Sequence, residues 1–449
     1  MLNTKNNIFK NGIASFFQKS VRVLEQLLLV PFFISAWGAA YYGEWLTLTI
    51  IPSILAYSDL GFGTAAANSF VLKYASGDKQ SAADISKTGF IIISFAILIG
   101  ILIGGIILAI IIHFNLLESS LIPFKEAVLA IFFIMFAKVM SFYNQLSEAH
   151  YRAARKASLS INYITLRGWL NIAIGLCMLL LGYRVVAFAI SQFIIAMLFN
   201  VFYGWQANKL LGLYKNVKGN FNKVYVREIA QKGFGFLMTP MWQSILFQGT
   251  TFVIRLTLGP VAVTIFNTVR TLSRSVNQMY SLINVSIFPE LQFEIGAGKW
   301  AKAQKIYIYA MRTTFILGLA GITFLAFFGL WLYGLWTHNM LTPPKTVWYM
   351  FLLGALFNAA WWTSGAVLRA MNRPYDLSVA GFITSVIAII CSYVFAQQWG
   401  FIGAAFGSLL FEILMMLYVL PVSCKLMHLS IKKVFDFKDF KIQLWKKQK

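Results

Sequence analysis

The chain carries a succession of apolar segments, each long enough to cross a lipid bilayer. The clearest one runs from Phe90 to Phe114 and consists mostly of isoleucine, leucine and glycine. The hydrocarbon layer is about 30 Å thick and a helix rises about 1.5 Å per residue, so about twenty apolar residues form one span. We interpret twelve segments as transmembrane helices: 13–36, 42–68, 89–113, 126–148, 161–182, 185–206, 231–256, 261–289, 308–334, 347–369, 377–397 and 401–423.

The composition supports a membrane location. Of the 449 residues, 59% are hydrophobic and only 12% are charged, and the mean hydropathy is +0.70. Soluble domains contain about 45–50% apolar and about 25% charged residues. Lipid is the solvent that accommodates the excess, and backbone polar groups inside lipid must be paired within the segment. We therefore expect an all-α integral membrane protein.

Lysine and arginine account for most of the charge and predict the orientation. The formal net charge is +23. Cytoplasmic loops of membrane proteins are enriched in these residues. If the N-terminus is cytoplasmic, every inner loop is more basic than its outer neighbours, which hold little beyond Lys125, Arg184, Arg255 and Lys345. Both termini are then cytoplasmic, and the charge faces membrane lipids of the anionic inner leaflet. Nucleic-acid binding is not expected.

The chain also contains an internal repeat. At an offset of 221 residues, Gly12, Gly38 and Gly77 align with Gly233, Gly259 and Gly298. Chance predicts about 0.5 glycine coincidences over such a window, and a fixed period indicates repeated structure. We expect two six-helix bundles, 1–210 and 231–424, joined by a cytoplasmic linker, 211–230, and followed by a basic tail, 425–449. An even number of spans per half gives both halves the same orientation, and transporters of this plan carry substrate between their halves.

Several charged residues lie inside the expected spans, where an ionised group usually faces a partner or a wet cavity. The segment 261–289 carries Arg270, Arg274, Asn277, Ser281 and Asn284 on one helical face. Adjacent arginines repel each other. Two interpretations remain open: a cavity that receives anions, or a structural ion pair, for example with Asp59 or Glu25 of the other half.

Other charges within the spans extend this set. Lys138 and Arg167 are further candidates for an anion-binding cavity, and Glu412 lies in the last span. Glu25 and Asp59 are candidates for coupling to H⁺ or Na⁺, with a local pair between Arg22 and Glu25 as the alternative. The deep cations outnumber the deep acids, which suits a multiply anionic cargo.

Nothing in the sequence indicates an enzyme. There is no ATP-binding P-loop and no nucleophile motif. The cysteines and histidines show no metal-ligand spacing. We expect no catalytic residue, no metal and no cofactor.

The two-bundle plan, the segment Tyr42-Gly43-Glu44-Trp45 and the run from Asp59 to Ala66 (Asp-Leu-Gly-Phe-Gly-Thr-Ala-Ala) together resemble a known group. The chain is similar to polysaccharide transporters of the multidrug/oligosaccharidyl-lipid/polysaccharide exporter superfamily, more narrowly to O-antigen flippases of the Wzx type. The resemblance implies a MATE-like exporter fold with a cationic lumen in the bacterial inner membrane. It also implies transfer of an undecaprenyl-diphosphate-linked oligosaccharide to the periplasmic leaflet, where an O-antigen polymerase would use it.

Three alternatives remain open. The chain could be a cation-coupled multidrug exporter, a peptidoglycan lipid-precursor flippase of the same superfamily, or a non-transporting scaffold for polysaccharide assembly. Drug exporters of the superfamily tend to rely on membrane acids, which are few here. Resistance assays, essentiality for growth and a transport assay in liposomes distinguish the three.

Overall fold

The computed structural model describes residues 2–56, 58–114, 121–215, 217–296, 298–371 and 373–436. Within these ranges the regular structure is entirely helical. Residues 437–449 of the predicted basic tail lie outside the described part of the chain. The molecule divides into two compact units, Met1–Ser244 (unit 1) and Ile245–Lys449 (unit 2). The assignment of 211–230 as a linker stays a prediction.

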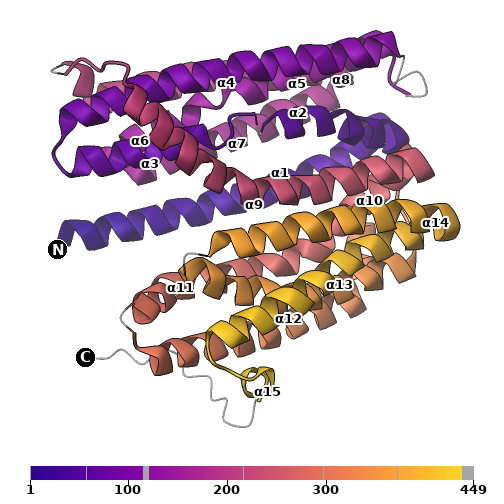
Figure 1. Ribbon diagram of the computed structural model, residues 1–449. Helices are drawn as coiled ribbons and strands as arrows, with labels where there is room; N and C mark the ends of the chain where they lie inside the picture. Colours follow the sequence, from indigo (N-terminus) through magenta and orange to yellow (C-terminus); the bar gives the residue numbers. More distant parts are fainter. Residues whose placement is uncertain are drawn as a thin grey trace. The chain divides into compact units, whose positions relative to one another are not determined.

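Unit 1 is built from long helices that run alongside one another (Figure 1). Helix α1 packs on α7, α5 packs on α8, and α3 contacts both α4 and α6. The helices are α1 (Leu2–Leu48), α2 (Ile50–Leu55), α3 (Phe62–Ala75), α4 (Lys79–His113), α5 (Phe124–Met140), α6 (Tyr143–Ala153), α7 (Ala157–Leu180), α8 (Val185–Leu211), the short 3₁₀ helix η1 (Leu213–Lys215) and the first part of α9 (Lys223–Leu258).

Unit 2 begins within α9 and repeats this plan. Helix α13 forms its centre, because it packs against α11, α12 and α14. The remaining helices are α10 (Pro260–Ser273), the 3₁₀ helix η2 (Arg274–Val276), α11 (Asn277–Gly296), α12 (Trp300–Trp336), α13 (Lys345–Ala370), α14 (Pro374–Leu426) and α15 (Ile431–Val434).

Within the described residues, eight continuous helical segments are long and apolar enough to cross a membrane. Two of them, Ile13–Leu55 with 43 residues and Tyr375–Leu426 with 52 residues, are about twice the length of one span. Each is interrupted by a glycine in a non-helical conformation, Gly38 in the first and Gly400 in the second. The predicted segments 231–256 and 261–289, in α9 and in α10–α11, are too polar to be counted among the eight. The number twelve therefore stays a prediction.

The internal repeat is visible in the backbone. Gly38 and Gly259 share an unusual conformation, with φ of 77° and 85° and ψ of 159° and 179°. Gly77 and Gly298 also share a positive φ, 87° and 69°, and each precedes the first residue of the next long helix by two positions. Pro123 and Pro344, again 221 residues apart, precede α5 and α13 with nearly the same backbone angles. The aligned positions therefore end and begin corresponding helices in the two units.

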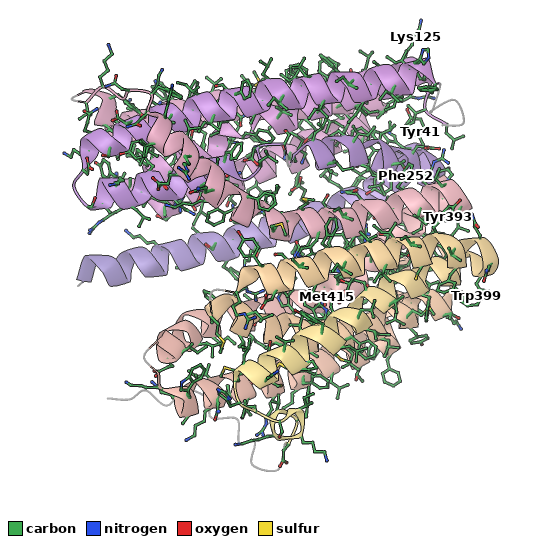
Figure 2. The ribbon with its side chains drawn as sticks, viewed as in Figure 1. Tyr41, Lys125, Phe252, Tyr393, Trp399 and Met415 are labelled. Carbon is green, nitrogen blue, oxygen red and sulfur yellow. The ribbon has the colours of Figure 1, made fainter. Side chains whose placement is uncertain are left out.

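Within unit 1, one end is defined by contacts between the turns. The indole of Trp37, beside the break at Gly38, donates a hydrogen bond to the carbonyl oxygen of Tyr183 at 3.0 Å. Figure 2 shows Tyr41 and Lys125 at this same end of the unit. Lys125 and Arg184 belong to the predicted outer loops, so this end corresponds to the predicted outer face.

Candidate functional site

Arg270 lies near the C-terminal end of α10 and is surrounded by neutral acceptors. One guanidinium nitrogen donates to the carbonyl oxygen of Phe247 and to the hydroxyl of Thr250, each at 3.2 Å. The other donates to the hydroxyl of Thr251 at 3.2 Å and to the side-chain oxygen of Asn267. Among the described residues no carboxylate pairs with Arg270. Its charge is solvated by α9 and by its own helix and is not neutralised.

Arg274, one turn further along, has an acidic partner. Its guanidinium lies 3.6 Å from Oε1 of Glu412 on α14. The other oxygen of Glu412 accepts hydrogen bonds from the amide of Asn358 at 2.9 Å and from the indole of Trp361 at 2.7 Å, both on α13. The carboxylate is thus fixed by neutral donors on one side and by Arg274 on the other.

The ring of Phe247 lies against both arginines. The guanidinium carbon is 5.1 Å from the ring centroid for Arg270 and 4.6 Å for Arg274. An aromatic face attracts a cation, and the attraction is stronger where water is excluded. Phe247 therefore helps to hold two like charges close together, which would otherwise repel each other.

A cavity of about 30 Å³ adjoins this cluster inside unit 2. Both arginines, Asn277 and Glu412 line it, together with side chains of α9, α13 and α14. A water molecule needs about 10–15 Å³ of this kind of volume, so the cavity holds about two waters. It has room for water beside the charged groups and is far too small for an oligosaccharide.

The cluster lies deep in the helical bundle. Glu412 is twelve residues beyond the break at Gly400 and Arg270 is eleven beyond Gly259, which at the helical rise puts them about 16–18 Å from those breaks. This is about half of the hydrocarbon thickness. Met415, one turn from Glu412, lies well along α14 from Trp399, near that break, in Figure 2.

The predicted polar face of 261–289 is only partly maintained. The helix tightens into η2 at Arg274–Val276, and such a 3₁₀ turn shifts the side chains that follow by changing the residues per turn. Asn277 still lines the cavity. Asn284 instead approaches the carbonyl oxygen of Trp362 at 3.5 Å, and the hydroxyl of Ser281 donates back to its own helix.

Unit 1 brings three of the other predicted site residues together. The carboxylate of Glu25 on α1 interacts with the charges of Arg22, Lys138 and Arg167, and with the amide of Asn171. Lys138 comes from α5, and Arg167 comes from α7. Arg167 also lies over the ring of Phe199, 5.2 Å from its centroid. Three cations therefore act electrostatically on one acid, so this group of four residues has a net positive charge.

Asp59 stands apart from both clusters. Its Oδ1 accepts a hydrogen bond from the backbone nitrogen of Gly61 at 2.9 Å, in the turn that separates α2 from α3. No cation contributes to its environment, whereas burial and the backbone nitrogens of Gly61 and Gly63 do. Its Oδ2 is buried without a hydrogen-bond partner. Asp59 thus caps the turn between α2 and α3 with one carboxylate oxygen, and its other oxygen makes no hydrogen bond.

The sequence analysis did not identify the partners of the arginines. It placed Glu412 inside the membrane but did not pair it with Arg274, and it gave no role to Phe247 or Thr250. The sequence did contain one signal of their common depth. Glu412 lies about as far beyond Gly400 as Arg270 lies beyond Gly259, so the two residues are expected at a similar depth in the membrane. The sequence left open whether the arginines form an ion pair and with which residue. Arg274 forms one with Glu412 of the same unit.

Comparison with known proteins gives the fold. No family model and no curated protein sequence matches the chain. The inward-facing form of a multidrug resistance MATE family transporter of the MOP superfamily superposes with a TM-score of 0.69 at 13% identity, covering 92% of this chain and 94% of that one. A MATE protein in complex with MaL6 gives 0.62 at 14% identity, covering 94% and 96%. A MOP superfamily transporter from Pyrococcus furiosus, reported with a binding pocket of reversed polarity, gives 0.62 at 13%, again covering 94% and 96%. The chain therefore has the MATE transporter fold.

Proposed function

We propose that the chain is a flippase that moves an undecaprenyl-diphosphate-linked oligosaccharide from the cytoplasmic to the periplasmic leaflet of the bacterial inner membrane. The observation that carries this proposal is the excess of cations over carboxylates in the charge cluster of each unit. Among the described residues, unit 2 places Arg270 and Arg274 near the single carboxylate of Glu412. In the described part of unit 1, the charges of Arg22, Lys138 and Arg167 act on the carboxylate of Glu25, and Arg22 and Lys138 are exposed.

An uncompensated cation at this depth is costly. An ionised side chain in the middle of a bilayer costs at least about 2.5–3.5 kcal/mol, and such residues mark substrate or ion pathways. Arg270 is the clearest case, since its hydrogen-bond partners are all neutral. A diphosphate offers several acceptor oxygens in the geometry that a guanidinium recognises. A multiply anionic cargo therefore explains a charge that packing alone would not retain.

The energy for transport is available without ATP. With the cell interior negative, moving an anion outward is favourable by about 2.3 kcal/mol per charge per 100 mV. We propose that H⁺ or Na⁺ resets the cycle at Glu25 or Asp59. The unused Oδ2 of Asp59 supports the second of these, and the position of Glu25 among three cations supports the first.

Complementation of a deletion strain tests the proposal. We expect Arg270→Ala and Arg274→Ala to abolish surface display of the polysaccharide at wild-type protein levels, and Arg270→Lys to retain part of it because the charge remains. Lys138→Gln with Arg167→Gln should weaken display in the same way. Arg227→Ala is the matched control, because Arg227 is an exposed arginine at the start of α9. Intact display in both alanine variants would refute the role of the cations.

Transport itself is tested with purified protein in liposomes. The wild type should move a fluorescent undecaprenyl-diphosphate oligosaccharide between leaflets, and Arg270→Ala should not. If the protein moves nothing but binds the polymerase, the scaffold interpretation replaces ours. If only the peptidoglycan precursor moves, the protein serves cell-wall synthesis.

A cation-coupled multidrug exporter is equally compatible with the fold. Glu412 supports it, because a buried carboxylate beside a small hydrated cavity could bind a proton or an organic cation. Drug-resistance assays separate the two. Increased sensitivity of the deletion strain to cationic drugs, with unchanged surface polysaccharide, would favour export of drugs over transfer of a lipid-linked sugar.

A further inference from the structure

Unit 1 contains a second, much larger pocket that the proposed transport function does not use. It measures about 730 Å³ and is formed by α4, α6, α8, Tyr214 and residues 217–219. Small-molecule sites measure about 300–1,000 Å³. Close by on α8, the ammonium of Lys209 lies 4.9 Å from the ring centroid of Trp205, an exposed tryptophan. Tryptophan and lysine collect at the membrane–water interface, so the pocket lies at the predicted cytoplasmic end.

The pocket wall is firmly built. The carboxylate of Asp84 on α4 accepts hydrogen bonds from the backbone nitrogen of Asn220 at 2.7 Å and from Gln80 at 3.0 Å. The hydroxyl of Thr88 accepts one from the backbone nitrogen of Asn222 at 3.1 Å. Gly219 lies so close to the backbone of Ala83 that a Cβ would not fit. These contacts fasten the connecting segment against α4.

A chain of hydroxyl groups leads to a buried histidine whose other ring nitrogen has no hydrogen-bond partner. Tyr214 donates its hydroxyl hydrogen to Ser86 at 2.5 Å, and Oγ of Ser86 lies 3.3 Å from Nε2 of His150. Ser86 can accept from Tyr214 and still either donate to or accept from Nε2, because a hydroxyl has two acceptor lone pairs; Nδ1 carries the ring hydrogen in the tautomer in which Ser86 donates. His150 is only 5% exposed. Asn208 approaches the ring, yet Nδ1 has no partner of hydrogen-bond geometry.

A second buried donor lines the same pocket. The side-chain oxygen of Asn200 on α8 accepts a hydrogen bond from the amide of Asn144 at 2.8 Å. The amide nitrogen of Asn200 is left buried without a partner. Buried polar groups are normally paired, and an exception requires an explanation. Of the two unpaired atoms in the described lining, Asn200 Nδ2 is a donor, and His150 Nδ1 is a donor when it carries the ring hydrogen; together they suit a ligand with acceptor oxygens.

The charges of the pocket have the same sign. Lys87 and Lys218 line it and are exposed, and its described lining contains no carboxylate. Phe90 and Tyr143 stack on each other at the wall, with ring centroids 4.9 Å apart and planes inclined by 21°. Two cations and two neutral donors suit a phosphate group, and the aromatic wall suits the apolar part of its ester.

The repeat supplies an internal comparison. Ser86, Ser147 and Asn208 line the pocket in unit 1. The corresponding residues of unit 2, at offsets of 221, 217 and 216, are Tyr307, Ser364 and Cys424. There the fully buried Tyr307 places its hydroxyl 2.8 Å from Ser364 and 3.9 Å from Cys424. One aromatic ring thus fills in unit 2 the place that unit 1 leaves open.

We propose that this pocket binds a phosphate ester, either the headgroup of an inner-leaflet lipid or a soluble phosphate ester. The phosphate oxygens accept from Lys87, Lys218, His150 and Asn200, and the organic part lies along Phe90 and Tyr143. The site is distinct from both cation clusters, so binding here does not depend on what the flippase carries. The ligand therefore binds outside the proposed transport path.

The test measures binding to the purified full-length protein by native mass spectrometry. The probes are phosphatidylglycerol in one arm and glycerol 3-phosphate in the other. For the arm that binds, Lys87→Gln combined with Lys218→Gln should weaken binding about thirtyfold, because each lysine near an anionic group contributes about 1 kcal/mol. Ser86→Tyr, which copies unit 2, should abolish it. Lys223→Gln is the control, since Lys223 is exposed at the start of α9 and does not line the pocket.

The arms separate the two sources. Binding of phosphatidylglycerol alone identifies a lipid headgroup, and binding of glycerol 3-phosphate with similar affinity identifies a soluble ester. The proposal is overturned if neither probe binds, or if the double lysine variant binds as the wild type does. The lysine variant changes only exposed side chains, so its result stands even if Ser86→Tyr fails to fold.

Discussion

Arg270 and Arg274 are one turn apart, but their surroundings differ. Arg270 is solvated by carbonyl, hydroxyl and amide oxygens, whereas Arg274 has the carboxylate of Glu412. Removal of a carboxylate from such a site leaves a buried cation uncompensated, which costs more than the pair itself contributes. Glu412 is therefore the residue on which the stability of the cluster most depends.

We expect Glu412→Ala to destabilise the protein by about 2–3 kcal/mol, less than the roughly 3–5 kcal/mol for a fully buried ion pair, because the Arg274 side chain is 35% exposed. Glu412→Gln should cost less, because its oxygen can still accept from Trp361 or Asn358. Thermal unfolding in detergent measures both. The control is Glu148→Ala, whose exposed pair with Arg152 at 3.8 Å should contribute at most about 1 kcal/mol. Equal stability of the two alanine variants would show that Glu412 does not compensate the arginines.

At the scale of helices, glycine determines where the spans end. Gly38 and Gly259 adopt positive φ with ψ near 180°, a region that is essentially restricted to glycine. A Cβ at either position would meet no atom within 4 Å. The requirement for glycine is therefore one of backbone conformation and not of space.

Alanine at these two positions tests that argument. We expect Gly38→Ala and Gly259→Ala each to lower the free energy of unfolding by about 1–3 kcal/mol, the cost of the strained backbone. Gly105→Ala is the matched control: Gly105 is helical, and its Cβ would also meet nothing. That change should stabilise α4 by about 0.5–1 kcal/mol. If all three substitutions changed the free energy of unfolding in the same direction, backbone conformation would not explain why glycine occupies both positions of the repeat.

The helices could be predicted more readily than the site. Apolar length was enough to locate α4 or α12, and the glycine spacing was enough to find the repeat. The count of spans was harder, because α9 and α10–α11 carry polar residues that lower their hydropathy. The η2 turn at Arg274 could not be foreseen, since a 3₁₀ turn depends on packing and not on local sequence.

Partners across helices are the part that a single sequence does not contain. The pairing of Arg274 with Glu412 joins residues 138 positions apart, and the packing of both η2 and α14 against α13 brings them together. The similar depth of Glu25, Lys138 and Arg167 could be predicted by counting residues from the ends or breaks of their helices. They lie thirteen, fourteen and thirteen residues from Gly38, Phe124 and Leu180, all at one end of unit 1, and so at about the same depth of 20 Å.

At the scale of the whole molecule, the repeat preserves helix ends and not chemistry. Pro123 and Pro344 begin equivalent helices with matching angles. The charge clusters differ: in unit 1 three cations act on one acid, and unit 2 keeps two arginines and a fixed carboxylate. Such divergence is expected of a duplicated scaffold whose halves have separate tasks, because turns are constrained by the backbone while lining residues are free to change.

The orientation of the two units in the membrane is the last prediction. The basic loops predict that both units point the same way, with their prolines Pro123 and Pro344 at the outer face. In a variant without native cysteines, Lys125→Cys and Lys345→Cys should react with a membrane-impermeant maleimide in intact spheroplasts. Lys79→Cys and Lys299→Cys should react only after permeabilisation. All four lysines are exposed, so a failure to react reports the membrane side and not burial.

Labelling of Lys125→Cys and Lys345→Cys from opposite sides would mean that the units are inverted relative to each other, which the repeat with an even number of spans does not allow. In that case the count of spans in one unit must be odd, and the polar helix α9 or the pair α10–α11 would be the segment that does not cross.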